Sequence, residues 1–206
     1  LYRTELPIDV ALVMVSKPDK HGFCSFGTSS DYTKPAADCA RIVIAQVNEH
    51  MPRTFGGNLI HVRDIDFIVE HSVPILEMQP AKIGILENKI GKYCSSLIKD
   101  GDCLQLGIGS IPESVLTFLW DKKNLGLHTE MASDGIIDLM VAGIINNKEK
   151  KNNPGRSVIT FVMGTKRLYD FIDDNPEISM HPVDYVNDPT VISQNDNVVS
   201  INSCIQ

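Results

Sequence analysis

The sequence predicts an α/β protein with open, mostly parallel sheets and flanking helices. Continuous apolar runs at Val10–Val15, Arg41–Val47 and Cys103–Ile108 are typical of strands covered on both faces. Helical patterns alternate with these runs, and strand–helix alternation of this length is typical of βαβ units. A chain of 206 residues buries a sizeable core without disulfides or a structural metal.

The first third of the chain predicts three strands and one short helix. A Gly-, Pro- and Ser-rich loop follows Val10–Val15, and a short helix is expected over Tyr32–Ala40. Arg41–Val47 and Leu59–Val62 are the next strands, whereas 64–75 has no clear period. The Pro-marked stretch "HSVPILEMQPAK" then predicts a boundary, with residues 1–78 on one side and 79–206 on the other.

The rest of the chain continues the alternation of helices and strands. Apolar residues from Ile83 to Ile98 recur at a helical period, with Leu86 and Leu97 among them, and Gly101 suits a helix C-cap. The segment 146–156 is a polar, charged loop. The further predicted strands are Cys103–Ile108, Leu125–Thr129, Val158–Met163 and Val198–Ile201, and the further helices are Ile111–Leu119, Gly135–Ala142 and Lys166–Ile172.

Composition excludes several classes of function. A net charge of −7 argues against binding to nucleic acid or to an anionic membrane, since both require a basic face. The five cysteines form no CxxC pair and no HExxH motif occurs, which indicates a reducing cytoplasm and no metal site. There is no signal peptide and no apolar run of membrane-spanning length. The chain lacks an initial methionine and stops inside a predicted strand, so we expect a fragment of a longer protein.

A glycine turn between a strand and a helix is the first candidate site. Gly107 and Gly109 allow a sharp turn and a close approach of ligand to backbone, and exposed N–H groups there favour an anion. Ser110 and Glu113 have the spacing of a capping box. A bare GxG is as often a tight connector, and Pro112 breaks the dinucleotide-binding fingerprint GxGxxG.

Glu130 is the second candidate site residue. Its strand follows that of the glycine turn, so the carboxyl ends of the two strands are expected to be neighbours. A carboxylate there can act as a base or a nucleophile, although a solvated strand end is the commoner reading. His128 shares its strand face and either orients Glu130 or is structural. Asp134 is expected to lie in a turn that caps the next helix.

Several long motifs follow one another along the chain, and two of them contain these candidate residues. "LQLGIGSIPESVL" followed by "LGLHTEMASDGIIDLMVAGII" resembles the class I coenzyme A transferases, in the acetyl-CoA hydrolase/transferase branch that includes butyryl-CoA:acetate and 4-hydroxybutyrate CoA-transferases. The stretches "SKPDKHGFCSFGTSSDYT", "IVIAQVNEHMPRTFGG", "FVMGTKRLYDFIDDNP" and "PVDYVNDPTVISQNDNVVSIN" agree. The resemblance covers essentially the whole chain.

The resemblance implies a fold and a set of domains. Residues 1–78 would be the C-terminal part of the first CoA-transferase domain, and 79–206 the N-terminal part of the second, which carries the catalytic glutamate. Each α/β lobe would be only partly present. A homo-oligomer is also implied.

The resemblance further implies ping-pong chemistry through a glutamyl-CoA thioester, with Glu130 as nucleophile. Short acyl-CoAs and carboxylates would be the substrates, without a permanently bound cofactor or metal. Gln206 occupies a place where some relatives carry Glu, and we assign it no catalytic role. The residues implied to bind CoA are Gly107, Ile108, Gly109, Ser110 and Ile111.

Two other readings stay open at this point. An acyl-CoA hydrolase would use the same scaffold and the same glutamyl thioester, with water as acceptor. A non-catalytic α/β ligand-binding module is the third reading, and it predicts that replacing Glu130 has no effect on function.

Overall fold

The N-terminal part of the computed structural model, which describes residues 4–203, is built on a parallel sheet in the order β1-β3-β6. The central strand β3 pairs in parallel with both neighbours. An antiparallel pair of short strands, β2 and β5, completes this part. Its elements are β1 (Val10–Val15), β2 (Phe23–Ser25), α1 (Thr33–Cys39), β3 (Ile42–Val47), β5 (Leu59–His61), η1 (Val62–Asp64) and β6 (Phe67–Glu70).

The second part contains a six-stranded sheet in the order β11-β7-β8-β9-β10-β4, in which all neighbours are parallel. The mostly parallel α/β class predicted from the sequence is therefore confirmed. Its strands are β4 (Phe55–Gly56), β7 (Cys103–Leu106), β8 (Gly126–Ala132), β9 (Ser157–Val162), β10 (Ile178–Met180) and β11 (Val198–Ile201). Its helices are α2 (Ile85–Ser95), α3 (Ser110–Leu116), α4 (Gly135–Val141), α5 (Lys166–Ile172), α6 (Val183–Val186) and α7 (Pro189–Ile192).

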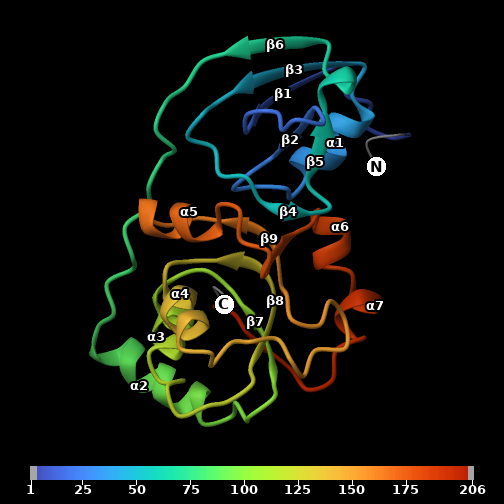
Figure 1. Cartoon of the computed structure of the whole chain (residues 1–206). Helices are drawn as coiled ribbons and strands as arrows, with labels where there is room; N and C mark the ends of the chain where they lie inside the picture. The colour runs from blue at the N-terminus through green and yellow to red at the C-terminus, as the bar shows by residue number, and fades with distance from the viewer. Residues whose placement is uncertain (1–3, 204–206) are drawn as a thin grey trace.

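The two parts stack on one another, and an extended segment passes along one side to join them (Figure 1). Each part has its own apolar core, one around Val15 and Phe26 and the other around Leu127 and Ile159. Strand β4 comes from the N-terminal part but adds to the edge of the larger sheet beside β10. The two cores are thus joined through a shared sheet. No helix within residues 4–203 has the length and apolar character needed to span a lipid bilayer.

The strand that carries Glu130 is longer than predicted. β8 continues past Thr129 to Ala132, so Glu130 lies inside the strand and not after its end. The sequence also missed β2, β4, β10, α6 and α7, each of two to four residues. Elements this short have too few residues to show a period, and tertiary contacts decide them.

The buried face of α2 differs from the predicted stripe. Leu86 and Leu97 are 65% and 71% exposed, whereas Gly91 and Ser95 are buried. A Cβ on Gly91 would lie 2.3 Å from the Ser114 hydroxyl, so small residues allow α2 to pack closely on α3. The helix ends at Ser95, and Gly101 lies in a later turn.

Two predicted caps and one predicted burial were also wrong. Gly109, which has no side chain, occupies the N-cap position of α3, and Ser110 is already the first helical residue, so the predicted capping box does not form. Asp134 accepts from the backbone and hydroxyl of Thr165 and does not cap α4. β1 is buried on one face only, since Leu12 is 77% exposed in the described structure.

Candidate active site

The candidate site lies where β7 ends and β8 separates from it. The two strands pair at Cys103–Gly126 and Leu104–Leu127 and then separate. A cavity of about 200 Å³ opens beyond this point. The glycine turn and Glu130 are neighbours there, as the sequence predicted. The lining residues are Gln105, Leu106, Gly107, Ile108, Glu130, Met131, Phe161, Asn202 and Ser203.

Glu130 is exposed, and its orientation is fixed by a residue far away in the sequence. Asn187, the residue after α6, donates its side-chain amide to Glu130 Oε2 at 2.7 Å. The amide holds one carboxylate oxygen and leaves the other free of described partners. An accessible carboxylate in a fixed orientation is what a nucleophilic glutamate requires.

His128 is structural and does not bind Glu130. Its ring Nε2 lies 2.8 Å from the Val186 carbonyl, and since a carbonyl only accepts, Nε2 carries the proton. Burial lowers the pKa of His128, which keeps the ring neutral. The histidine therefore ties β8 to the end of α6, next to the Asn187 that orients Glu130.

The N-terminal part brings a second carboxyl group toward Glu130. The Asp31 backbone N–H donates to the Thr160 carbonyl on β9 at 3.3 Å, and the Asp31 carbonyl accepts from Val183 at 3.1 Å. Burial and the charge of Glu130 raise the pKa of Asp31. Asp31 and Asn187 were not predicted as site residues, although Asp31 lies in the motif stretch "GTSSDYT" and Asn187 in "PVDYVNDPT".

The glycine turn is shaped by close contact on one side and open space on the other. A Cβ on Gly107 would lie 2.6 Å from Asn202 Oδ1, so a larger residue there would displace the Asn202 side chain, which follows β11. Gly109 has φ +106 and nothing within 4 Å of a Cβ position, which leaves room for a ligand. Ile108 is exposed between them. Ser110 and Ile111 begin α3 and do not line the Glu130 cavity.

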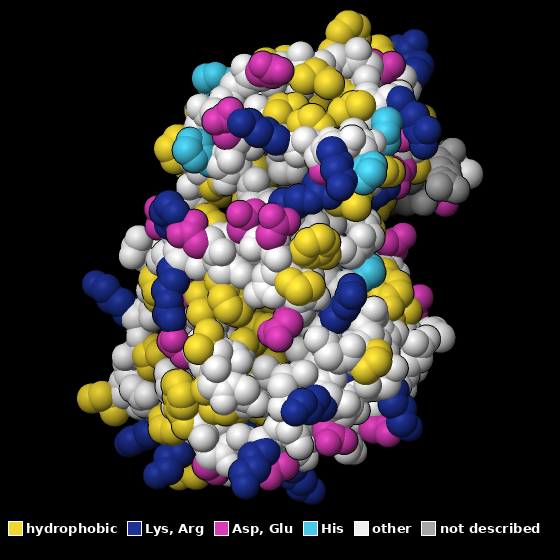
Figure 2. Space-filling view, in the orientation of Figure 1, with side chains coloured by type: hydrophobic (Ala, Val, Ile, Leu, Met, Phe, Trp, Pro, Cys, Tyr) yellow, Lys and Arg dark blue, Asp and Glu magenta, His cyan; other side chains and the backbone are white. Residues whose placement is uncertain are grey.

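A larger cavity of about 670 Å³ adjoins the Glu130 cavity, and the two share Ile108, Met131 and Phe161. The linker residues Met78–Ala81 close one side of it, and an ion pair between Arg167 and Asp138 lies at its edge. In Figure 2, hydrophobic side chains gather around α4 in this region. The cavity provides a mostly apolar approach to the glycine turn.

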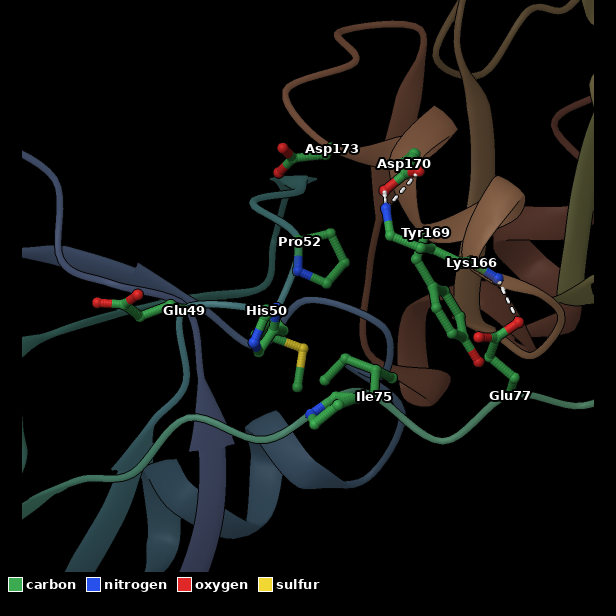
Figure 3. A pocket seen from close by; sticks show the side chains of 11 residues that line it. Glu49, His50, Pro52, Ile75, Glu77, Lys166, Tyr169, Asp170 and Asp173 are labelled. Carbon is green, nitrogen blue, oxygen red and sulfur yellow. Dashed lines mark hydrogen bonds and ion pairs between the residues drawn. The ribbon is translucent and has the colours of Figure 1, made fainter.

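A third cavity, of about 240 Å³, lies at the junction of the two parts (Figure 3). Several of its polar groups already have partners: Lys166 pairs with Asp170, Glu77 accepts from the Lys166 backbone, and Tyr169 donates to the Leu76 carbonyl at 2.7 Å. Within residues 4–203, no cluster of His, Cys, Asp and Glu could hold a metal ion. Gln206 lies outside the described residues.

Known proteins resemble the chain in both sequence and structure. It is 62% identical over 201 residues to the 4-hydroxybutyrate coenzyme A transferase of Clostridium kluyveri, covering 98% of this chain and 47% of that protein. It is 48% identical to the succinyl-CoA:cyclohexane-1-carboxylate CoA transferase of Geobacter metallireducens, covering 100% and 47%. The crystal structure of 4-hydroxybutyrate CoA-transferase from Porphyromonas gingivalis superposes with a TM-score of 0.93 at 52% identity, covering 96% and 51%. The chain thus spans about half the length of the curated relatives it matches.

The fold is therefore that of the CoA-transferases. Sequence profiles of the acetyl-CoA hydrolase/transferase N-terminal domain and C-terminal domain match residues 2–78 and 164–206. The chain belongs to the acetyl-CoA hydrolase/transferase family.

Proposed function

We propose that this chain supplies the nucleophile of a CoA-transferase, and that Glu130 is that nucleophile. The observation that carries the proposal is the position of Glu130: exposed, oriented by Asn187, and facing the glycine turn across one small cavity. Family membership supports CoA transfer as the reaction class.

In each step of the proposed reaction one anion attacks a carbonyl carbon and another anion leaves it. A Glu130 oxygen attacks the acyl-CoA carbonyl, the C–S bond breaks, and CoA leaves as a thiolate, which gives a mixed anhydride. The thiolate attacks the glutamyl carbonyl, which releases the first acyl group as a carboxylate and leaves a glutamyl-CoA thioester. An acceptor carboxylate then reverses both steps. No net proton transfer is needed, which agrees with a neutral His128 bound to a carbonyl elsewhere.

The glycine turn has the groups to stabilise the developing oxyanion. The Ile108 and Gly109 N–H groups have no acceptor among the residues that the structure describes. Backbone donors already fixed in place need no reorganisation when negative charge develops, and they act more strongly where water is excluded. This supports contact of Gly107–Gly109 with the reacting end of the acyl-CoA.

The larger cavity suits the rest of the substrate. It is mostly apolar, it leads from the linker at Met78–Ala81 to Ile108, and it meets the Glu130 cavity there. The flexible arm of CoA is long, thin and only partly polar. Binding of this arm, away from the reacting carbon, provides free energy that orients and desolvates the thioester.

The substrates we propose are short-chain acyl-CoAs, such as acetyl-, butyryl- or 4-hydroxybutyryl-CoA, with a small carboxylate as acceptor. The relatives at 62% and 52% identity are both named for 4-hydroxybutyrate, which supports this range.

Replacing Glu130 tests the proposal. In the full natural protein, Glu130→Ala should lower the rate of transfer by about 10³-fold or more, because the nucleophile is lost. Mass spectrometry after incubation with acyl-CoA should locate the adduct on Glu130 in the wild type. Glu177→Ala, an exposed glutamate at the start of β10, is the control and should keep its activity. Near-normal turnover in Glu130→Ala would falsify the assignment.

Equal CoA release with and without a carboxylate acceptor would identify a hydrolase instead.

A further inference from the structure

The sheet opens in its middle at the candidate site. β7 and β8 pair only at Cys103–Gly126 and Leu104–Leu127. Beyond these pairs, β7 stays with β11 up to Leu106–Ile201, and β8 stays with β9 up to Ala132–Val162. The separation is therefore confined to two central strands, whereas their outer neighbours remain paired.

The side chain of Thr129 spans this separation. Its hydroxyl accepts from the Leu106 N–H at 3.0 Å and lies 2.8 Å from the Leu106 carbonyl, to which it donates. A second acceptor, the Met131 carbonyl, lies at 3.1 Å. Thr129 and Leu106 are both buried. One hydroxyl thus satisfies both the donor and the acceptor of Leu106, which would otherwise be left unpaired away from water.

The position of this bridge ties it to the candidate site. Thr129 directly precedes Glu130, and Leu106 directly precedes Gly107. The Glu130 cavity lies in the gap just beyond the bridge. Direct backbone pairing would bring the strands to about 4.8 Å, which would close this gap.

We propose that Thr129 is a positioning residue, whose hydroxyl holds β7 and β8 apart so that an acyl carbonyl fits between Glu130 and the glycine turn. The inference rests on the proposed function. Thr129 acts through the backbone on either side of it and does not itself touch the substrate. Its effect should therefore appear in the rate of the chemical steps and not in the binding of the distant parts of CoA.

Substitutions that separate the hydroxyl from the bulk of the side chain test this role in the full natural protein. Thr129→Ser keeps the hydroxyl and should retain kcat within about 3-fold. Thr129→Val keeps the shape but leaves Leu106 unpaired, and it should lower kcat by about 10- to 100-fold with KM for acyl-CoA within about 3-fold, because small displacements of reacting groups cost this much. The Glu130 adduct should form more slowly by the same factor.

A matched control lies on the next strand. Thr160 is also fully buried, but its hydroxyl has no hydrogen-bond partner within the described part of the chain. Thr160→Val makes the same chemical change without removing a bridge, and it should keep kcat within about 3-fold. If Thr129→Val does not fold, Thr129→Cys replaces it, since a thiol is a weak donor that should give an intermediate kcat.

The outcomes separate this inference from the proposed function. Wild-type kcat in a folded Thr129→Val or Thr129→Cys protein would overturn the positioning role while leaving Glu130 as the nucleophile. A fall in kcat in Thr129→Ser equal to that in Thr129→Val, or an equal fall in Thr160→Val, would also overturn it. An active Glu130→Ala protein would instead remove the proposed function, whatever the Thr129 variants show.

Discussion

At the scale of single residues, the candidate nucleophile depends on a partner that the sequence places 57 positions away. Asn187 donates to Glu130 Oε2 at 2.7 Å. Asn187→Ala removes a hydrogen bond to a charged group, which is worth roughly 1.5–3 kcal/mol, and we expect kcat/KM for transfer to fall about 10- to 100-fold. Asn187→Asp should be worse, because a second negative charge would disfavour ionised Glu130. Steady-state kinetics with both substrates varied would measure these changes.

A second asparagine provides the comparison for this prediction. Asn175 donates its side-chain amide to the Phe171 carbonyl at 3.0 Å, after α5, and does not line the Glu130 cavity. Asn175→Ala should lower stability slightly without changing kcat/KM. Equal kinetics in Asn187→Ala and the wild type would show that Glu130 does not need this amide.

The site could be predicted from sequence only where its residues are close together in the chain. Gly107, Gly109 and Glu130 belong to consecutive strand–turn units, and parallel pairing brings such ends together. Asp31 and Asn187 enter from a long loop and from a four-residue helix, neither of which has a period that fixes its direction. Local spacing therefore predicted that Glu130 lies beside the glycine turn, and the family resemblance made it the candidate nucleophile, but neither predicted the groups that orient and surround it.

At the scale of elements, the most misleading segment was the charged loop between α4 and β9. Its composition predicts solvent exposure, but Lys150 is buried and donates to the carbonyls of Leu127 at 2.8 Å and Arg156 at 2.7 Å. Asn147 accepts from the Leu127 N–H at 2.9 Å. Asn147 and Lys150 of the loop thus pair with the backbone N–H and carbonyl of Leu127, as a neighbouring strand would do at the start of β8. Composition does not predict the burial of Lys150, because the methylene groups of a lysine pack like an apolar side chain once its ammonium group is hydrogen-bonded.

Lys150 should make stability depend on pH. Burial lowers the pKa of Lys150 from the ordinary 10.5 to about 8. Above pH 8 the folded chain therefore loses this proton while the unfolded chain keeps it, and the free energy of unfolding rises with pH. We expect the free energy of unfolding to gain about 1 kcal/mol between pH 7.5 and 9 from this group. Urea unfolding at several pH values would measure it.

Two lysine variants isolate this contribution. Lys150→Met should remove the rise, whereas Lys151→Met should keep it, because Lys151 is exposed and pairs with Asp196 at 2.6 Å. Burial raises the pKa of Cys103 to about 11, which opposes the trend increasingly as the pH approaches 9, so the comparison ends there. The same slope in the wild type and Lys150→Met would show that Lys150 titrates normally in the folded chain.

At the scale of the whole molecule, two apolar cores are joined by the linker and by backbone hydrogen bonds between the N-terminal part and the larger sheet. The linker is held where Tyr169 donates to Leu76, beside the cavity of Figure 3. A second connection is β4, which pairs with β10 at Phe55–Ser179 and Gly56–Met180. A third is the segment 28–31, whose backbone is hydrogen-bonded to β9. The sequence predicted two strand–helix series and a boundary segment between them. It did not predict β4, because a strand of two residues is too short to show a hydrophobic pattern. The coupling of the cores is therefore visible only in the structure.

Gly56 is one residue on which this coupling depends. Its φ is +113, and a Cβ would lie 2.2 Å from the Met180 carbonyl oxygen, so Gly56→Ala cannot keep the β4–β10 pairing. We expect a loss of roughly 3 kcal/mol from backbone strain and the clash together. Gly155→Ala is the control: φ is +73 but nothing lies within 4 Å, so it should cost only about 1 kcal/mol.

The single tryptophan allows the coupling itself to be tested. Trp120 follows α3, so its fluorescence reports on the second part, whereas far-ultraviolet circular dichroism reports on both parts. In the wild type and in Gly155→Ala the two urea transitions should coincide, as cooperative unfolding requires. In Gly56→Ala the dichroism should begin to fall at lower urea than the fluorescence, because the N-terminal core then unfolds without the larger sheet. Coincident transitions in Gly56→Ala at the wild-type midpoint would mean that the two parts are coupled mainly through the other contacts, which are those of the linker around Tyr169 and of residues 28–31 with β9.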